Sequence, residues 1–201
     1  MTFIDELERL YNERGAARYE PGCPGGVSQL QHALQCAALA ADALASPSLV
    51  VAALLHDLGH LLSPASAGGL ADGLSSGFAG SPDDGLDDAH QITAPSVLRP
   101  HFPPAVLEPI RLHVDAKRYL CAVERGYWAE LSTGSQHSLA LQGGPFDSAQ
   151  VAAFVATPYA EQAVWLRRWD DRAKDPRRRV LPFADYRSLL AQLATHAVAD
   201  A

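Results

Sequence analysis

The segment "ALLHDLGHLL", residues 53–62, is an apolar run that is interrupted by His56, Asp57 and His60. Burying a polar group without a partner costs free energy, and burying an unpaired charge costs more. A metal ion is a common partner of neighbouring His and Asp side chains in a protein interior. The segment therefore predicts a buried helix that carries metal ligands, and the remaining ligands must come from other parts of the chain.

The composition indicates a globular protein and excludes several classes of function. Hydrophobic residues make up 48% of the 201 residues, which is too many for a disordered chain. The formal net charge of −7 disfavours a nucleic-acid-binding protein, which would carry a basic stripe. We find neither a signal peptide at the N-terminus nor a run of the ~20 apolar residues that a membrane span requires. The three cysteines form no C-x-x-C pair, which fits a reduced, cytoplasmic protein. From the charge and the missing apolar run we expect neither nucleic-acid nor membrane partners.

Helical periodicity recurs along the chain, and no stretch shows the alternation that is typical of a strand. The fold class is therefore predicted to be all-α, with one domain over 1–201 and its core at about 27–176. A Thr2-x-x-Asp5 capping box marks the first helix, and Ser46 or Ser48 is the candidate N-cap of the helix that contains His56. The Gly/Ser-rich segment 63–87 is expected to be a flexible loop. The predicted helices are 2–11, 27–44, 46–62, 88–99, 104–118, 119–132, 147–155, 158–174 and 183–197.

Six ionisable residues occupy helical positions that otherwise face the core: His32, His56, Asp57, His90, His113 and Asp170. A single histidine on an apolar face is more often a hydrogen-bonded core residue than a metal ligand. Six such residues in one chain favour a metal site instead. Adjacent helical residues diverge by about 100°, so the His56 and Asp57 side chains leave the helix in different directions.

The order H…HD…H…H…D is similar to the ligand pattern of the HD-domain superfamily. Within it, the chain resembles the mixed-valent diiron oxygenases that cleave carbon–phosphorus bonds, relatives of myo-inositol oxygenase. "LQGGP" and "RRWDD-x-x-K" are the most specific of the matching motifs. The stretches that carry the resemblance are "VSQLQHALQCA", "AALLHDLGHLL", "DDAHQITA", "IRLHVDAKRYL", "LSTGSQHSLALQGGPF" and "LRRWDDRAKDP".

The resemblance implies two iron ions, active as Fe(II)/Fe(III), that use O2 to convert an α-hydroxyalkylphosphonate to phosphate and a carboxylic acid. One iron would be held by His32, His56, Asp57 and Asp170. The second would be held by His90 and His113, with Asp57 as a bridge. The phosphonate would contact His60, Lys117, Ser135, Ser138 and Arg167, among which His60 and Lys117 are also expected to be catalytic. His60 and Lys117 each follow a metal ligand by one helical turn, which places them on the same helix faces as those ligands.

Several alternatives remain open at this stage. A metal-dependent phosphohydrolase of a nucleotide or phosphate monoester could use the same ligands, with a metal-bound hydroxide as nucleophile. Lys117 and Arg167 could be solvated surface charges, and Asp171 competes with Asp170 for the ligand position. The sequence indicates neither the oligomeric state nor a partner enzyme.

One departure from the family pattern concerns the substrate. Relatives that act on amino-substituted phosphonates carry a Tyr and a Glu shortly before the "VSQ" segment, where this chain has the uncharged "GCPGG". Tyr19 and Glu20 lie further upstream and could replace them only through a different loop path. A cationic amine would lack an anionic partner, so we expect a substrate whose tail is neutral, small or absent.

Overall fold

The structure of the chain, a computed structural model, describes residues 1–19, 26–62 and 90–194. These residues form eleven α-helices and a 3-10 helix, and among them the only extended pairing is an isolated bridge between Arg18 and Ser28. The all-α prediction is therefore confirmed. The predicted loop 63–87 and the last residues of the predicted helix 183–197 lie outside the described part of the chain.

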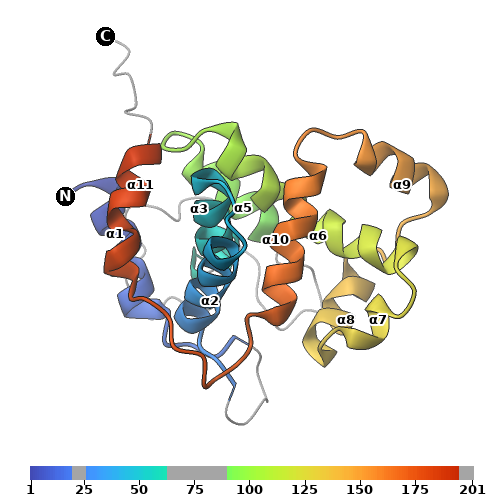
Figure 1. Ribbon diagram of the computed structural model, residues 1–201, viewed down its shortest axis with the longest axis horizontal. Helices are drawn as coiled ribbons and strands as arrows, with labels where there is room; N and C mark the ends of the chain where they lie inside the picture. Colours follow the sequence, from blue (N-terminus) through green and yellow to red (C-terminus); the bar gives the residue numbers. More distant parts are fainter. Residues whose placement is uncertain (20–25, 63–89, 195–201) are drawn as a thin grey trace.

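The helices form a layered bundle with two flanks (Figure 1). In the middle, α2, α3, α5, α6 and α10 pack against one another, while α1 and α11 lie together on one flank and α7, α8 and α9 on the other. The bounds are α1 Phe3–Arg14, α2 Gln29–Asp42, α3 Pro47–Leu55, α4 Leu58–Leu62, α5 His90–Leu98, α6 Pro104–Val123, α7 Tyr127–Glu130, α8 Thr133–Leu141, α9 Ser148–Val155, α10 Ala160–Arg172, η2 Phe183–Tyr186 and α11 Arg187–Leu193.

Local signals in the sequence set the starts of the first three helices. The predicted capping box at Thr2 and Asp5 begins α1, and Ser46, rather than Ser48, caps α3. A second box, formed by Ser28 and Gln31, begins α2. Each box satisfies backbone N–H groups that the first helical turn leaves unpaired.

Helix α3 lies at the centre of the main hydrophobic core, which also includes parts of α1, α2, α6, α10 and α11. All residues from 49 to 55 are buried. A helix that is apolar on every side cannot leave one side in water, so it takes the central position. The C-terminal end of this central helix is where the ionisable residues of the opening segment begin.

Two predicted helix boundaries are wrong, for identifiable reasons. The helix expected over 46–62 is interrupted at His56 and Asp57, because α4 begins with a tighter turn in which the His60 N–H donates to the Asp57 carbonyl at 3.0 Å. The helices expected at 104–118 and 119–132 are instead one helix, α6, followed by short α7. The chain breaks near Gly126, whose φ of +93° is accessible to glycine at little cost. Helix α8 was not predicted.

Candidate metal centre

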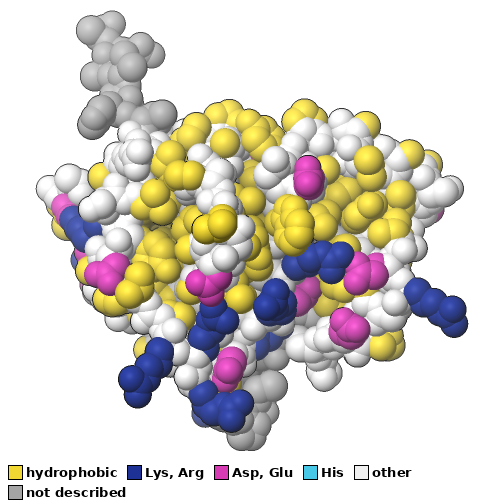
Figure 2. Space-filling model, in the orientation of Figure 1, with side chains coloured by type: hydrophobic (Ala, Val, Ile, Leu, Met, Phe, Trp, Pro, Cys, Tyr) yellow, Lys and Arg dark blue, Asp and Glu magenta, His cyan; other side chains and the backbone are white. Residues whose placement is uncertain are grey.

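The six predicted metal ligands meet inside the helical bundle. They come from α2, the α3–α4 junction, the start of α5, the middle of α6 and the end of α10. Each of these residues is buried, with 8% or less of its surface exposed, and on the face shown in Figure 2 no histidine side chain of the described residues is visible. Their use as ligands stays a prediction, which the geometry supports as follows.

His32 and His56 present their Nε2 atoms to each other at 3.3 Å. The Nδ1 atom of His32 lies 2.9 Å from the Ala173 carbonyl oxygen, and that of His56 lies 2.9 Å from the Ala53 carbonyl oxygen. A carbonyl oxygen only accepts, so both Nδ1 atoms carry the hydrogen and both Nε2 atoms are left to bind an ion. Such second contacts are the usual way in which proteins orient ligating histidines.

His90 and His113 form a second pair, with their Nε2 atoms 3.1 Å apart. The Nδ1 atom of His113 donates to the Ile110 carbonyl oxygen at 2.6 Å, which again leaves Nε2 for an ion. Two nitrogens that lie ~2.1 Å from one ion, at octahedral to tetrahedral angles, are roughly 3.0–3.4 Å apart. Both imidazole pairs have this spacing.

Asp57 lies between the two pairs and offers one oxygen to each. Its Oδ2 atom is 3.5 Å from His32 Nε2 and 3.2 Å from His56 Nε2. Its Oδ1 atom is 3.6 Å from His90 Nε2 and 3.8 Å from His113 Nε2. Oδ2 is buried and accepts no hydrogen bond from the described residues. A buried carboxylate oxygen without a donor is costly, and an ion bound beside it would remove that cost.

The close approach of α4 to α5 depends on Gly59. A Cβ atom at this position would lie 2.6 Å from the His90 carbonyl oxygen and 2.7 Å from its Cα atom, which is too close for any other residue. The absence of a side chain therefore lets the His90 imidazole reach Asp57. His60, the residue after Gly59 on α4, stacks on the His90 ring with centroids 4.1 Å apart, and its Nε2 atom is 3.9 Å from Asp57 Oδ1.

Asp170 completes the first group of ligands, and Tyr19 lies over it. Asp170 Oδ1 is 3.4 Å from His32 Nε2 and accepts a hydrogen bond of 3.0 Å from the Tyr19 hydroxyl. The Tyr19 ring also stacks on His32, with centroids 3.6 Å apart. Tyr19 is held there by its N–H, which donates to the Val27 carbonyl oxygen at 3.0 Å. Tyr19 thus reaches the cluster, whereas Glu20 and the loop that follows lie outside the described residues.

The charges of the cluster balance one another in the metal-free protein. Burial would raise the pKa of Asp57, but the His56 and His60 imidazoles outweigh it and hold that pKa well below the ordinary range. Burial would lower the pKa of His56, but the Asp57 and Asp170 carboxylates raise it to about 9. Burial lowers the pKa of His113 well below its ordinary value. A proton therefore rests at His56 while His113 stays neutral, and a bound cation can replace that proton.

Four of the five predicted phosphonate contacts, all except His60, converge where α8 packs near α6 and α10. Lys117 Nζ donates to Ser138 Oγ at 2.8 Å, and Arg167 Nη2 lies 3.5 Å from Ser135 Oγ. Arg167 also pairs with Asp170, Nη1 to Oδ2, at 2.7 Å. Both cations are almost fully buried, with Lys117 2% and Arg167 4% exposed. The alternative that they are solvated surface charges is therefore wrong. We call Lys117, Arg167 and Lys174, together with Ser135 and Ser138, the cation group.

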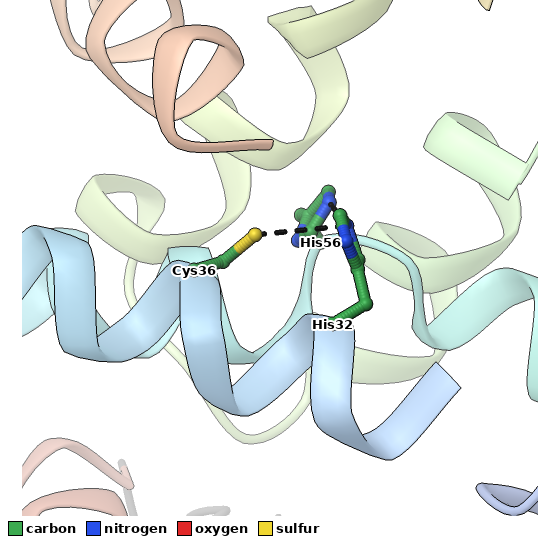
Figure 3. Close-up of side chains that lie close together, drawn as sticks. All are labelled: His32, Cys36 and His56. Atoms are coloured by element: carbon green, nitrogen blue, oxygen red, sulfur yellow. Dashed lines mark hydrogen bonds between the residues drawn. The ribbon is translucent and has the colours of Figure 1, made fainter. Parts of the chain in front are cut away.

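Three members of the site had no role in the sequence interpretation. Lys174 Nζ donates to Ser132 Oγ at 3.0 Å and lies 3.5 Å from Ser135 Oγ. Gln35 exchanges two hydrogen bonds with the Asp175 backbone and so fixes the segment whose Ala173 carbonyl holds His32. The Cys36 sulfur lies 3.6 Å from His32 Nε2 (Figure 3). Spacing was the available signal, since Cys36 follows His32, and Lys174 follows Asp170, by one helical turn.

Asp171 takes a different part from Asp170. Its carboxylate accepts hydrogen bonds from the Arg167 guanidinium and from the Tyr127 hydroxyl. Asp170 instead contributes one of four possible ligand atoms that all lie within 4.8 Å of one another. The other three come from His32, His56 and Asp57. The geometry thus favours Asp170 as the ligand and Asp171 as the residue that orients Arg167.

Comparison with known proteins places the chain in a family. A family profile described as "HD domain" matches residues 30–189. A protein from Gimesia maris named hydroxymethylphosphonate dioxygenase is 38% identical over 193 residues, which are 96% of this chain and 89% of the relative. The chain belongs to the HD-domain family. A second relative, from Leisingera caerulea, is named 1-hydroxy-2-(trimethylamino)ethylphosphonate dioxygenase (glycine-betaine-forming). It is 35% identical over 86% of this chain and 81% of its own length.

Family membership extends to the branch of HD-domain proteins that contains these phosphonate dioxygenases. The HD pair that names the family is His56–Asp57, at the α3–α4 junction where the two imidazole pairs meet. Among the described residues, none of the helices combines the length and the apolar character needed to cross a bilayer.

Proposed function

We propose that this HD-domain protein is an iron- and O2-dependent oxygenase that cleaves the carbon–phosphorus bond of an α-hydroxyalkylphosphonate. The products are phosphate and a carboxylic acid. The position of Asp57 is the observation that carries the proposal: one oxygen faces His32 and His56, and the other faces His90 and His113. This arrangement suits two ions that share one carboxylate.

The donor set fits iron. Imidazole nitrogens and carboxylate oxygens are suitable ligands for first-row transition metals, and six protein ligands leave coordination positions open on a pair of ions. His32, His56, Asp57 and Asp170 would hold one iron, and Asp57, His90 and His113 the other. When bound, an Fe(II)/Fe(III) pair supplies Lewis acidity and the electrons for O2 chemistry.

The residues of the chain would bind and orient the substrate. Lys117 and Arg167 offer N–H donors to the phosphonate oxygens, and Ser135 and Ser138 offer hydroxyl donors. Charge-assisted hydrogen bonds from buried cations are among the strongest that a protein makes to such an anion. His60, one turn beyond His56, lies beside the half of the cluster that contains His90. Binding the phosphonate among these donors would place its hydroxyl-bearing carbon at the metal pair and exclude water from it.

The substrate class follows from the two named relatives and from the chain itself. Both relatives are named for phosphonates that carry a hydroxyl group on the carbon bonded to phosphorus. The "GCPGG" segment contributes no charge, so we infer a preference for a neutral or absent tail, as in hydroxymethylphosphonate. Its reaction with O2 would give formate and phosphate, and the equation balances without another oxidant or reductant.

The decisive experiment is a phosphate-release assay with protein purified anaerobically and loaded with iron. A panel of hydroxymethylphosphonate, a neutral 1-hydroxyalkylphosphonate and 1-hydroxy-2-aminoethylphosphonate is assayed with and without O2. We expect one O2 consumed per phosphate released, and no release under anaerobic conditions. Release of phosphate from phosphate monoesters or nucleotides without O2 would instead establish the phosphohydrolase alternative.

The panel also tests the inference about the tail. Tyr19 reaches the cluster, so the loop that bears it could also bring Glu20 toward a substrate amine. A hundredfold higher kcat/KM for the amino compound, abolished by Glu20→Gln, would overturn the preference for a neutral tail. That result would not affect the oxygenase assignment, because O2-dependent phosphate release from either compound supports it.

A further inference from the structure

A sulfur donor faces the first imidazole pair. Cys36 follows His32 by four residues on α2, so both side chains project from one face of that helix. Its thiol is fully buried, and Figure 3 shows it directed toward His32 and His56. None of the roles described above uses this thiol.

The two measured separations among these three donors match a tetrahedral ion. With metal–nitrogen bonds of ~2.1 Å and a metal–sulfur bond of ~2.3 Å, tetrahedral angles give separations of roughly 3.4 Å between nitrogens and roughly 3.6 Å between nitrogen and sulfur. The observed separations are 3.3 Å between His32 Nε2 and His56 Nε2, and 3.6 Å between His32 Nε2 and Cys36 Sγ. All three donor atoms lie within 4.8 Å of one another.

The two imidazoles therefore belong to two overlapping sets of donors. One set adds Asp57 and Asp170, and the other adds Cys36. In its neutral form each imidazole has a single lone pair on Nε2, since its Nδ1–H is committed to a backbone carbonyl. One ion at a time can use the pair, so occupation of either set excludes the other.

We propose that His32, Cys36 and His56 form an alternative site for a thiophilic divalent ion such as Zn²⁺ or Cd²⁺, which competes with the carboxylate-rich site at the same imidazoles. A thiolate favours soft ions, whereas carboxylates favour harder ions such as Mn²⁺. The thiol proton and the proton on His56 leave to solvent as the metal–sulfur and metal–nitrogen bonds form, because the thiolate and the neutral imidazole are the forms that ligate. The metal supplied to the protein then decides which set of donors is used.

The test uses metal ions alone, on the full chain, without phosphonate or O2. Replacing Cys23 and Cys121 by Ala leaves Cys36 as the single cysteine, so any sulfur signal comes from it. We expect one equivalent of Co²⁺ to give a thiolate-to-cobalt charge-transfer band, and zinc-loaded protein to show one sulfur ligand by X-ray absorption. Nitrogen and oxygen ligands alone, in both measurements, would overturn the proposal.

The matched variant is Cys36→Ala, with Cys121→Ala as control. Loss of an outer-shell partner alone typically weakens metal binding 10–100-fold, so loss of a direct ligand should weaken Cd²⁺ binding by about tenfold or more. Mn²⁺ binding, which uses the carboxylates, should change less than about twofold. Equal loss for Cd²⁺ and Mn²⁺, or unchanged Cd²⁺ binding, would refute the alternative site.

A folding defect in Cys36→Ala would not affect the outcome, because the single-cysteine protein retains Cys36 and gives the spectroscopic answer by itself. The proposal is also independent of the proposed oxygenase function. Even if the protein released no phosphate from any phosphonate, the spectra would still decide whether sulfur binds Co²⁺ and Zn²⁺.

Discussion

The imidazoles and carboxylates that are predicted to bind metal lie among the central helices, whereas the cation group lies where α8 meets α6 and α10. In the cluster, backbone carbonyls hold His32, His56 and His113 in place, and a buried oxygen of Asp57 accepts no hydrogen bond from the described residues. In the cation group, Lys117 and Arg167 already have hydroxyl and carboxylate partners. The first region is built to receive a cation, and the second carries donors that an anion can take over.

Two helices join these regions. On α6, Lys117 follows His113 by one turn, and on α10, Arg167 precedes Asp170 by one turn. Metal ions and phosphonate would therefore sit side by side, and the phosphonate anion would offset positive charge from both the metal ions and the cation group. Substitutions in one region should leave the other measurably intact, and five predictions test that separation from the largest expected effect to the smallest.

Asp57→Ala should remove both metal ions, because each imidazole pair loses its shared carboxylate. His90→Ala should remove mainly one ion and leave the His32–His56 pair occupied. Elemental analysis of anaerobically loaded protein measures the metal per chain, with circular dichroism as the check on folding. A full complement of metal in Asp57→Ala would contradict the shared-ligand arrangement.

Arg167→Gln should destabilise the metal-free protein by about 3–5 kcal/mol, because the buried Asp170 and the partly buried Asp171 lose their cation. Loading with Mn²⁺ should recover part of this loss, since Asp170 then has the metal as its partner. Urea denaturation with and without Mn²⁺ measures both effects. An equal loss in the two states would mean that Asp170 does not bind the metal.

The metal-free protein should lose stability as the pH rises from 6.5 to 9. The pKa of His56 is raised from 6.5 to about 9, so its proton stabilises the folded state below pH 6.5, and this contribution is lost as the pH passes 9. The slope should reach at most about 1.4 kcal/mol per pH unit. Mn²⁺-loaded protein, in which His56 is already deprotonated, should lack this slope in denaturation experiments at pH 6.5, 8 and 9.

Lys117→Ala should raise the KM for the phosphonate tenfold or more without removing metal. A charge-assisted hydrogen bond is worth about 1.5–3 kcal/mol, which corresponds to roughly 10–100-fold in affinity. Steady-state kinetics measures KM, and elemental analysis of the same protein measures its metal content. An unchanged KM would exclude Lys117 from the phosphonate contacts.

Asp171→Asn should have the smallest effect, because Asp171 acts through Arg167. If a less well oriented Arg167 weakens phosphonate binding by about 1 kcal/mol, KM should rise roughly fivefold. Metal content should stay unchanged, whereas Asp170→Asn should lose metal from the first position. Loss of metal in Asp171→Asn would reverse the assignment of the two aspartates.

Local features of the sequence predicted much of the architecture. Capping boxes and hydrophobic periodicity mark the helices, because both depend on residues three or four positions apart. The same spacing relates His113 to Lys117 and His56 to His60. The six ligand positions could be chosen because each interrupts an apolar helix face, and the structure brings all six together.

Other features depended on residues far apart in the chain. The interruption at His56 and Asp57 coincides with contact between Gly59 and His90, and an uninterrupted periodic pattern gives no sign of it. Helix α8 was missed because it is short and weakly amphipathic, so that packing stabilises it more than its own sequence does.

The sequence by itself determined which residues can bind a metal, since that is a matter of side-chain chemistry and helical spacing. The tertiary structure decided how they are used. It brought Tyr19 onto His32 and Asp170, set Asp171 against Arg167, and directed Cys36 toward the two imidazoles. Tyr19 and Asp170 are 151 positions apart in the chain. Only the folded bundle brings such residues together, because no local interaction relates them.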